Sequence, residues 1–416
     1  MPSLLGWLAI LMLLAGTTAR AADLPGPWVE VASDGRLDVR SVIAPGMSCA
    51  KVVADGTVLT SEMRGKVDGD YPVQTCIAHA AATSRQITVD GLAAPVLSND
   101  IKRIVVLGDT GCRLEGSFTQ DCNDPVKWPF ATVARLAATH RPDLVIHVGD
   151  YYYRETACPD SRPGCAGSPF GDNWAVWQKD FFNPAAPLLA AAPWVMVRGN
   201  HEICSRGGHG WFRLLDPHPS ADRCTDTTQP YALRIGSLSL VLFDGSDADD
   251  RNADPAKVAA YRDQLKSALA DVPAHSWLLT HRPIWALVQG YDAKPGSTLN
   301  ATEQAAIRDL VPAGLDMVLS GHVHDFTSYQ FDASRPAQLI VGEGGDVHDD
   351  ISQPVNPGIA IDGVKVRRAF ATPDYGYVVL HRVSQGWTGT VYSLTDEVLA
   401  RCRLHGRQLA CRSISR

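Results

Sequence analysis

The run IVVLG (residues 104–108) stands directly before Asp109, and the chain repeats this arrangement four more times. Each run is apolar, ends in Gly or Thr and precedes a residue type that binds metals: VIHVG before Asp150, WVMVRG before Asn200 and His201, WLLT before His281, and MVLSG before His322 and His324. A β-strand delivers its next residue to the edge of a sheet, and ligands of open α/β sheets collect outside the carboxyl ends of the strands. The sequence therefore predicts that positions 109 to 324 converge on one site.

The residues that follow these runs are two Asp, one Asn and four His, which offer oxygen and nitrogen donors to hard or borderline metals. Two carboxylates in one crevice of low dielectric repel each other, and one would protonate unless cations were present. A pair of ions about 3.5–4 Å apart needs a carboxylate that bridges both, and Asp150 is the candidate. The alternative for either Asp is a helix N-cap, but the fivefold repetition favours a metal site.

Asn200 and His201 are expected to have different roles. Asn200 would supply an amide oxygen after Gly199, whose missing Cβ permits a tight turn. The adjacent His201 would point elsewhere and act as an acid or a hydrogen-bond donor to the substrate; the alternative is a histidine that only packs or supports a ligand. In an extended segment His322 and His324 share one face, so each could reach a different ion of a close pair.

The composition and the N-terminal residues indicate which partners and which compartment to expect. Its 416 residues are 45% hydrophobic and carry a net charge of −7 without a basic run or stripe, which disfavours binding to a nucleic-acid backbone. Residues 4–16 are almost wholly apolar and precede Ala19-Arg20-Ala21, so residues 1–21 are predicted to be a signal peptide cut after Ala21. The protein is therefore expected to be secreted or periplasmic, without a membrane anchor after cleavage.

Ten cysteines follow the predicted cleavage site, which agrees with an oxidising compartment. A zinc cluster is the alternative, but the chain has no C-x-x-C pair. Spacing suggests neighbouring pairs, although sequence alone leaves the connectivity open. The suggested pairs are Cys49 with Cys76, Cys112 with Cys122, Cys158 with Cys165, Cys204 with Cys224, and Cys402 with Cys411.

The pattern of short runs changes near residue 98. Residues 22–98 alternate strand-like stretches with Gly and Asp turns, which predicts a small N-terminal β-rich module. From residue 101 strands and helices alternate, which predicts a layered α/β catalytic domain over residues 99–416 that ends in β-hairpins. Residues 154–173 are rich in Gly, Pro, Ser and Cys and are expected to form a loop.

Taken in order, these motifs resemble those of the calcineurin-like metallophosphoesterase superfamily, and within it they are similar to the purple acid phosphatases. Most of the superfamily has a His two positions after the first Asp, where this chain has Gly111. The purple enzymes instead use a Tyr three positions after the bridging Asp, where Tyr153 stands. The motifs are Asp109-x-Gly111, Gly149-Asp150-x-x-Tyr153, Gly199-Asn200-His201-Glu202, His281, and Gly321-His322-x-His324.

The resemblance covers about residues 101–345 and implies a four-layer fold in which two facing mixed β-sheets are flanked by helices. It implies a first ion held by Asp109, Asp150, Tyr153 and His324, and a second held by Asp150, Asn200, His281 and His322. A phenolate ligand normally titrates near pH 10, so the Tyr153 site is expected to hold Fe(III), with Fe(II), Zn(II) or Mn(II) beside it. The alternative for Tyr153 is a wall aromatic in the run of residues 151–153.

The resemblance also implies the reaction. The chain is expected to be a secreted binuclear phosphoester hydrolase acting on small phosphate esters, with monoesters favoured. A hydroxide on the metals would attack phosphorus and His201 would assist the leaving group. The alternatives are a phosphodiesterase or nucleotidase on the same metals, and a non-catalytic secreted metal- or phosphate-binding protein. Glu202 and residues 325–327 depart from the usual purple phosphatase pattern, which bears on substrate identity.

Overall fold

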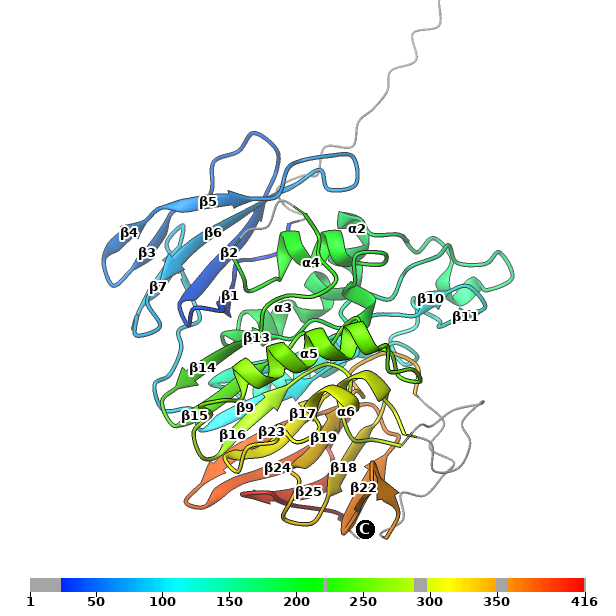
Figure 1. The fold of residues 1–416 in the computed structure, drawn as a ribbon. Helices are drawn as coiled ribbons and strands as arrows, with labels where there is room; N and C mark the ends of the chain where they lie inside the picture. Colours follow the sequence, from blue (N-terminus) through cyan, green and yellow to red (C-terminus); the bar gives the residue numbers. More distant parts are fainter. Residues whose placement is uncertain (1–23, 220–222, 288–297, 349–357, 415–416) are drawn as a thin grey trace, which may run out of the picture.

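The computed structural model describes residues 24–219, 223–287, 298–348 and 358–414, and Figure 1 shows their arrangement. The predicted signal peptide lies outside these residues. Within the described ranges, no helix has the length and apolar character needed to cross a membrane.

Two large mixed sheets form the molecule. The first sheet has eleven strands, in the order β26 (Gln408–Ser413), β25 (Val398–His405), β24 (Gly386–Ser393), β23 (Gly376–Val383), β9 (Arg103–Leu107), β12 (Leu144–His147), β13 (Trp194–Met196), β1 (Trp28–Val31), β2 (Leu37–Ile43), β6 (Gln74–Ala80) and β5 (Ser61–Arg64). The second has seven strands, in the order β14 (Tyr231–Ile235), β15 (Leu238–Leu242), β16 (Ser276–Leu279), β17 (Leu315–Ser320), β19 (Ala337–Val341), β18 (Phe326–Gln330) and β22 (Arg368–Thr372).

The central strands of both sheets are parallel, which brings their carboxyl ends to common edges. In the first sheet β9, β12 and β13 run parallel, and in the second β15, β16, β17 and β19 do so. The predicted hairpin of β14 and β15 is present as an antiparallel pair. The C-terminal strands β23 to β26 form antiparallel hairpins that extend the first sheet beyond β9.

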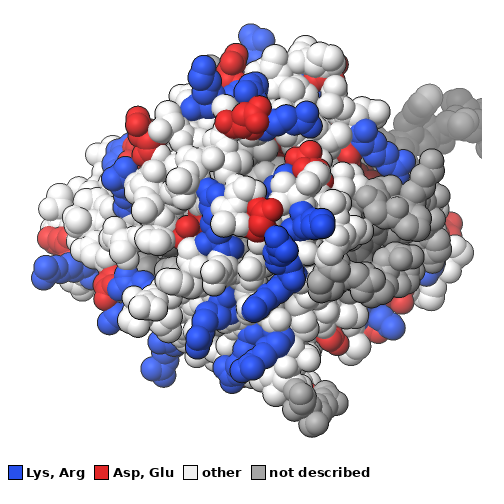
Figure 2. Space-filling view, turned by 60° about the horizontal axis from the view of Figure 1, so that its bottom comes forward, with Lys and Arg blue, Asp and Glu red and all other residues white. Residues whose placement is uncertain are grey.

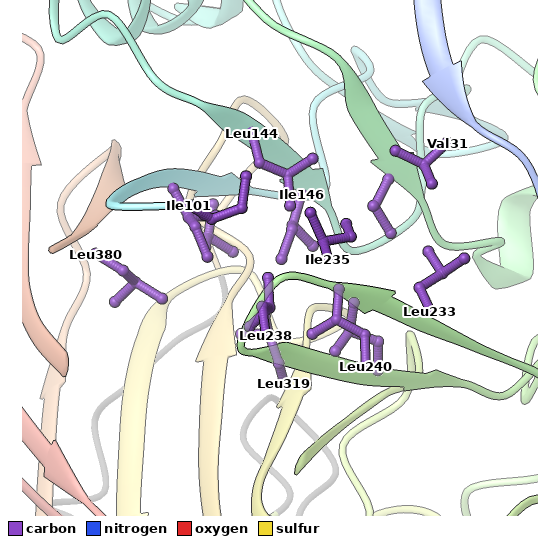
Figure 3. Close-up of a cluster of buried hydrophobic side chains, with 14 of the residues drawn as sticks. Val31, Ile101, Leu144, Ile146, Leu233, Ile235, Leu238, Leu240, Leu319 and Leu380 are labelled. Atoms are coloured by element: carbon purple, nitrogen blue, oxygen red, sulfur yellow. The ribbon is translucent and has the colours of Figure 1, made fainter. Parts of the chain in front are cut away.

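Alternation of side chains along the strands builds three cores. Ile104 and Val106 of β9 face the core between the sheets, whereas Val105 and Leu107 face an aromatic-rich core on the other side. In β17, Leu319 likewise enters the central core and Val318 a third core. Figure 3 shows leucine, isoleucine and valine side chains from both sheets meeting in the central core.

Helices cover the two outer faces. Residues of α1 (Phe130–Thr139), α2 (Trp174–Trp177), α3 (Asn183–Leu189) and α4 (Gly208–Leu214) pack in the aromatic-rich core, and a π-helical turn (Gln178–Phe182) joins α2 to α3. Residues of α5 (Pro255–Ala268) and α6 (Ala301–Ile307) pack in the third core. The order of layers is helix, sheet, sheet, helix, which confirms the predicted fold of two facing mixed sheets.

The N-terminal region contributes to two sheets. Its strand β1 pairs in parallel with β13, so β1, β2, β6 and β5 continue the first large sheet. A separate four-stranded sheet contains β4 (Thr57–Leu59), β3 (Val52–Ala54), β7 (Ile87–Val89) and β8 (Leu92–Ala94). The division of the chain near residue 98 stays a prediction. Two small hairpins complete the strands, β10 (Leu114–Glu115) with β11 (Phe118–Thr119) and β20 (Ala360–Ile361) with β21 (Val364–Lys365).

All five suggested cysteine pairs are disulfides, which confirms that expectation. No described cysteine is left as a free thiol. The loop predicted at residues 154–173 is present and contains one short 3-10 turn, Pro163–Cys165.

Candidate active site

Both sheets contribute residues to one site at the carboxyl ends of their parallel strands. The first sheet supplies Asp109 after β9, Asp150 after β12 and Asn200 after β13. The second supplies His281 after β16 and the pair His322 and His324 after β17. The structure thus brings together every residue that the sequence placed in the site, from segments more than 200 positions apart (109 to 324).

Left-handed backbone and close glycine contacts shape this edge. Asp109, Asp150 and His322 have φ of 54°, 59° and 71°, conformations that cost about 1–3 kcal/mol each and that persist where surrounding structure fixes them. A Cβ on Gly199 would lie 2.0 Å from Asp150 Oδ1, and one on Gly321 would lie 2.3 Å from Asp109 Oδ2. These two positions therefore accept only glycine without movement of a carboxylate.

The expectation that His322 and His324 lie in an extended segment is wrong. His322 is left-handed, because its backbone N–H donates to both carboxylate oxygens of Asp109, each at 3.0 Å. The two imidazoles nevertheless reach different neighbours: His324 Nε2 lies 3.0 Å from Tyr153 Oη, whereas the His322 ring packs edge to face against His281 with centroids 5.2 Å apart.

A first donor group surrounds the phenol of Tyr153. Its Oη lies 2.9 Å from Asp150 Oδ2, 3.2 Å from Asp109 Oδ1 and 3.0 Å from His324 Nε2, and its single hydrogen can be donated to either carboxylate. The side chains of Asp109, Asp150 and Tyr153 are almost completely buried. Gly111 lies against Tyr153, since a Cβ there would be 2.8 Å from Tyr153 Cδ2. The absence of a side chain at residue 111 thus leaves room for the Tyr153 ring.

A second donor group surrounds His281. Its Nε2 lies 3.1 Å from Asp150 Oδ2 and 3.1 Å from Asn200 Oδ1, while its Nδ1 lies 2.8 Å from the carbonyl oxygen of Val148. Donor atoms of Asp150, His281 and His322 all lie within 4.8 Å of one another. The same oxygen, Asp150 Oδ2, thus faces both donor groups, which is the position of a single oxygen that bridges two ions.

The donor set fits two cations. Ligands bound to one ion at about 2.0–2.2 Å and at right angles are separated by about 3 Å, which matches the distances of 2.9–3.2 Å around Tyr153 Oη and of 3.1 Å around His281 Nε2. Burial and the neighbouring Asp150 raise the pKa of Asp109 well above its ordinary value. Burial, Asp150 and Asp109 also raise the pKa of Tyr153 well above 10. Cations would relieve this crowding of buried acids.

The pKa values of Asp109 and Asp150 are shifted in opposite directions. Burial alone would raise the pKa of Asp150, but His281 and His201 hold it well below its ordinary value. For Asp109 the effects of burial and of the neighbouring Asp150 prevail, and its pKa is raised. Asp150 is therefore the anion of the pair, which suits the residue that faces both donor groups.

His201 lies beside the first donor group without joining it. Its ring packs on Tyr153 with centroids 3.8 Å apart, its Nδ1 lies 2.7 Å from Glu155 Oε1, and its Nε2 lies 3.9 Å from Asp150 Oδ2. Arg206 Nε in turn contacts Glu155 at 2.6 Å. Burial lowers the pKa of His201 well below its ordinary value. The ring is held by its packing on Tyr153 and places Nδ1 beside Glu155 and Nε2 on the side of Asp150, although Nδ1 makes no hydrogen bond of good geometry with a described residue.

Glu202, which departs from the usual pattern, holds the loop that carries Asp150. Its buried carboxylate accepts the backbone N–H groups of Asp150, Tyr151 and Tyr152 at 2.8–3.1 Å, and that of Gly199 at 2.9 Å. Burial and the nearby Asp150 raise the pKa of Glu202 to about 8. Glu202 therefore holds the backbone of the loop that carries Asp150, and its fully buried side chain is not exposed at the surface of the site.

Sequence reasoning missed the polar partners of His322 and His201. Arg282 Nη1 lies 2.9 Å from His322 Nε2, and Asp250 Oδ2 lies 3.1 Å from the same atom. Arg282 directly follows His281 and Glu155 stands two residues after Tyr153, so inspection of positions flanking the motifs would have found both. Asp250 ends the acidic stretch 247–250 and carries no comparable signal.

Comparisons with known proteins agree with this geometry. The family model described as calcineurin-like phosphoesterase matches residues 102–326, more than half of the chain. The chain belongs to this family. The match contains all the donor residues named above.

Among curated relatives of this calcineurin-like phosphoesterase, purple acid phosphatase 22 of Arabidopsis thaliana is 22% identical over 233 residues, which are 53% of this chain and 48% of that protein. The chain thus spans about half the length of this relative. Among solved structures, a purple acid phosphatase from yellow lupin (Lupinus luteus) seeds aligns with a TM-score of 0.60 at 14% identity, covering 89% of this chain and 72% of that one.

The structure of PhoD aligns with a TM-score of 0.54 at 13% identity, over 94% of this chain and 91% of that one. At such identities the two structural likenesses show the shared fold alone. The family match covers both donor groups described above, which are the candidate metal ligands of this calcineurin-like phosphoesterase.

Proposed function

We propose that this chain is a binuclear metal-dependent phosphomonoesterase of the purple acid phosphatase type. One observation carries the proposal: Asp150 Oδ2 lies 2.9 Å from Tyr153 Oη and 3.1 Å from His281 Nε2. This single oxygen joins a group that contains a phenol to a group of histidine and amide donors.

In the proposed site, Asp109, Asp150, Tyr153 and His324 hold the first ion, and Asp150, Asn200, His281 and His322 hold the second. A phenol titrates near pH 10, and burial raises the pKa of Tyr153 further, so the first position suits Fe(III). The second suits Fe(II), Zn(II) or Mn(II). The two ions would supply positive charge that polarises the phosphoryl oxygens and acidifies a water molecule.

The protein's own side chains position the substrate and move a proton. His201 Nδ1 lies 2.7 Å from Glu155 Oε1; a proton held on the opposite ring nitrogen, Nε2, would pass to the departing alkoxide of a phosphate ester. Arg282 contacts His322, pairs with Asp250 and has a side chain that is 12% exposed; its remaining N–H groups would bind a phosphate oxygen. Cations attract the doubly charged phosphate of a monoester more strongly than the singly charged phosphate of a diester, which supports monoesters.

The five disulfides support action outside the cytoplasm, in agreement with the signal peptide expected at residues 1–21. The proposed substrate is a small phosphate ester. Secretion or periplasmic export and the substrate class are parts of the proposal.

Metal analysis and assays on a monoester and a diester test it. We expect two ions per chain, a visible band from the phenolate–iron pair that Tyr153→Phe abolishes, and faster hydrolysis of the monoester. Colourless protein with full activity would show that the Tyr153 assignment is wrong. Faster hydrolysis of the diester would replace the monoesterase by a phosphodiesterase on the same site.

A further inference from the structure

A groove of about 520 Å³ lies on the C-terminal strands, apart from the candidate active site. The pairing of β18 with β22 shows where the groove lies. At the end of β18 near His324, Phe326 lies opposite Thr372; at the other end, Gln330 lies opposite Arg368. Four strand positions, about 13 Å, separate Arg368 from the active-site end. The polar side chains lining the groove are those of Arg368, Thr388, Thr390, Arg401, Arg403 and Arg412.

The four arginines are exposed and concentrated. Arg401 lies directly opposite Arg412 in the pairing of β25 with β26, and Arg403 follows two residues later on the same face, about 7 Å away. Like charges that face each other across strands are destabilising. Neither an acidic lining residue nor an ion pair to any of the four arginines occurs in the part of the chain that the structure describes.

This concentration contrasts with the chain as a whole, whose net charge is −7. In Figure 2 the molecule is turned so that the bottom of Figure 1 faces the reader, and Lys and Arg side chains gather at the lower centre of this view. The groove could not be predicted from the sequence. Its arginines come from three different strands, and along β25 they alternate with other residues, so they form no basic run.

Protection of sheet edges does not account for the groove. Strands β22 and β26 end their sheets, and charged side chains on edge strands discourage pairing with another chain. However, Arg401 and Arg403 lie on β25, one strand inside the edge. Two of the four charges thus stand where no edge needs protection.

The chemistry of the lining selects among anionic partners. Arginine binds carboxylate, sulfate and phosphate groups through two parallel hydrogen bonds. None of the described residues that line the groove is aromatic, so they provide no stacking platform of the kind on which single-stranded nucleic acids depend. The described lining residues also include no exposed large apolar side chain that could insert into a bilayer.

A slender polymer with repeated charges and hydroxyl groups fits these features, since Thr388 and Thr390 line the same hollow beside Arg403 and Arg401. We propose that this groove binds an acidic polysaccharide through carboxylate or sulfate groups that recur along the polymer. The site is independent of the phosphoesterase reaction and would hold the protein on an anionic matrix.

Titration of the metal-loaded protein with heparin, and separately with polygalacturonate, tests this proposal. The double variant Arg401→Gln/Arg403→Gln should bind about ten-fold more weakly, since two exposed charge contacts are lost, and the salt dependence of binding should decrease. The affinity of the double variant Arg401→Lys/Arg403→Lys should lie between that of the wild type and that of the double Gln variant. The matched control Arg85→Gln/Arg251→Gln removes the same charge from exposed positions outside the groove and should bind like the wild type.

Phosphate-ester hydrolysis should be unchanged in all three variants. Equal binding by the groove variant and the control would overturn the proposal. It would also be overturned if single-stranded DNA or phosphatidylglycerol vesicles bound through these arginines while neither polysaccharide did. Self-association of the groove variant without loss of polysaccharide binding would assign the arginines to edge protection instead.

Discussion

Replacing His201 with Ala separates proton transfer from metal binding. The backbone N–H of residue 201 donates to Asp150 Oδ1 at 2.9 Å, and alanine keeps this hydrogen bond. Asp150 should therefore stay oriented and both ions should remain bound. The variant loses the imidazole Nε2, which lies 3.9 Å from Asp150 Oδ2, beyond hydrogen-bond range of that oxygen and directed toward the site.

Loss of a general acid costs about 10²–10⁴ in rate, which corresponds to about 3–5 kcal/mol in the barrier. This loss should appear in full with an alkyl phosphate, whose alkoxide needs a proton. It should be much smaller with 4-nitrophenyl phosphate, whose leaving group is a stable anion. Contact of the His201 ring with Tyr153 contributes only about 0.5–1.5 kcal/mol to stability, so the variant should fold.

The assay compares turnover of both esters and metal content in wild type, His201→Ala and the control His209→Ala, which alters an exposed histidine. Equal rate losses with both esters, or loss of metal from His201→Ala, would refute the acid role. Either result would assign His201 to support of the metal site.

Further predictions concern the bridge, the disulfides and a buried acid. Asp150→Ala should lose one or both ions as well as activity, because its Oδ2 serves both donor groups; retention of two ions by mass spectrometry would contradict the bridging role. Reduction should lower the melting temperature, since each disulfide contributes about 2–4 kcal/mol, whereas ten titratable thiols in unreduced protein would contradict the bridges. Burial raises the pKa of Glu343 to about 8 and outweighs the effect of the residue's own backbone N–H, and no other described residue donates a hydrogen bond to its carboxylate. The folded state therefore keeps a proton that the unfolded state releases above about pH 4.5, and stability should fall as pH rises from about 4.5 to 8. Thermal melts of metal-saturated protein should show a flatter decline in Glu343→Gln, and an unchanged slope would show that Glu343 is ionised in the folded state.

The parallel strands and the residues after them could be predicted because each strand is a short apolar run with a distinct end. The order of the strands within each sheet could not be predicted, since nothing in residues 28–31 specifies pairing with β13. Helix α4 contains two glycines, which oppose helix formation. It is stabilised by burial of Trp211, Phe212 and Leu214, a tertiary effect.

The candidate site was predictable where chemistry repeats along the sequence and unpredictable where it depends on the turn geometry. The left-handed backbone of His322 follows from its bonds to Asp109, 213 positions away. Glu155 and Arg282 gain their positions from loops that fold back on His201 and His322. The groove arginines show the same limit, because strand pairing alone brings Arg401 opposite Arg412.

Anomalous diffraction from crystals of the metal-loaded protein, collected at the iron edge and at the zinc and manganese edges, tests the central claim most directly. We predict two peaks about 3.5–4 Å apart with a carboxylate oxygen of Asp150 between them. The iron peak should lie within about 2.2 Å of Tyr153 Oη, and the other peak within the same distance of His281 Nε2. A single ion, or an iron ion that Tyr153 does not touch, would contradict the account.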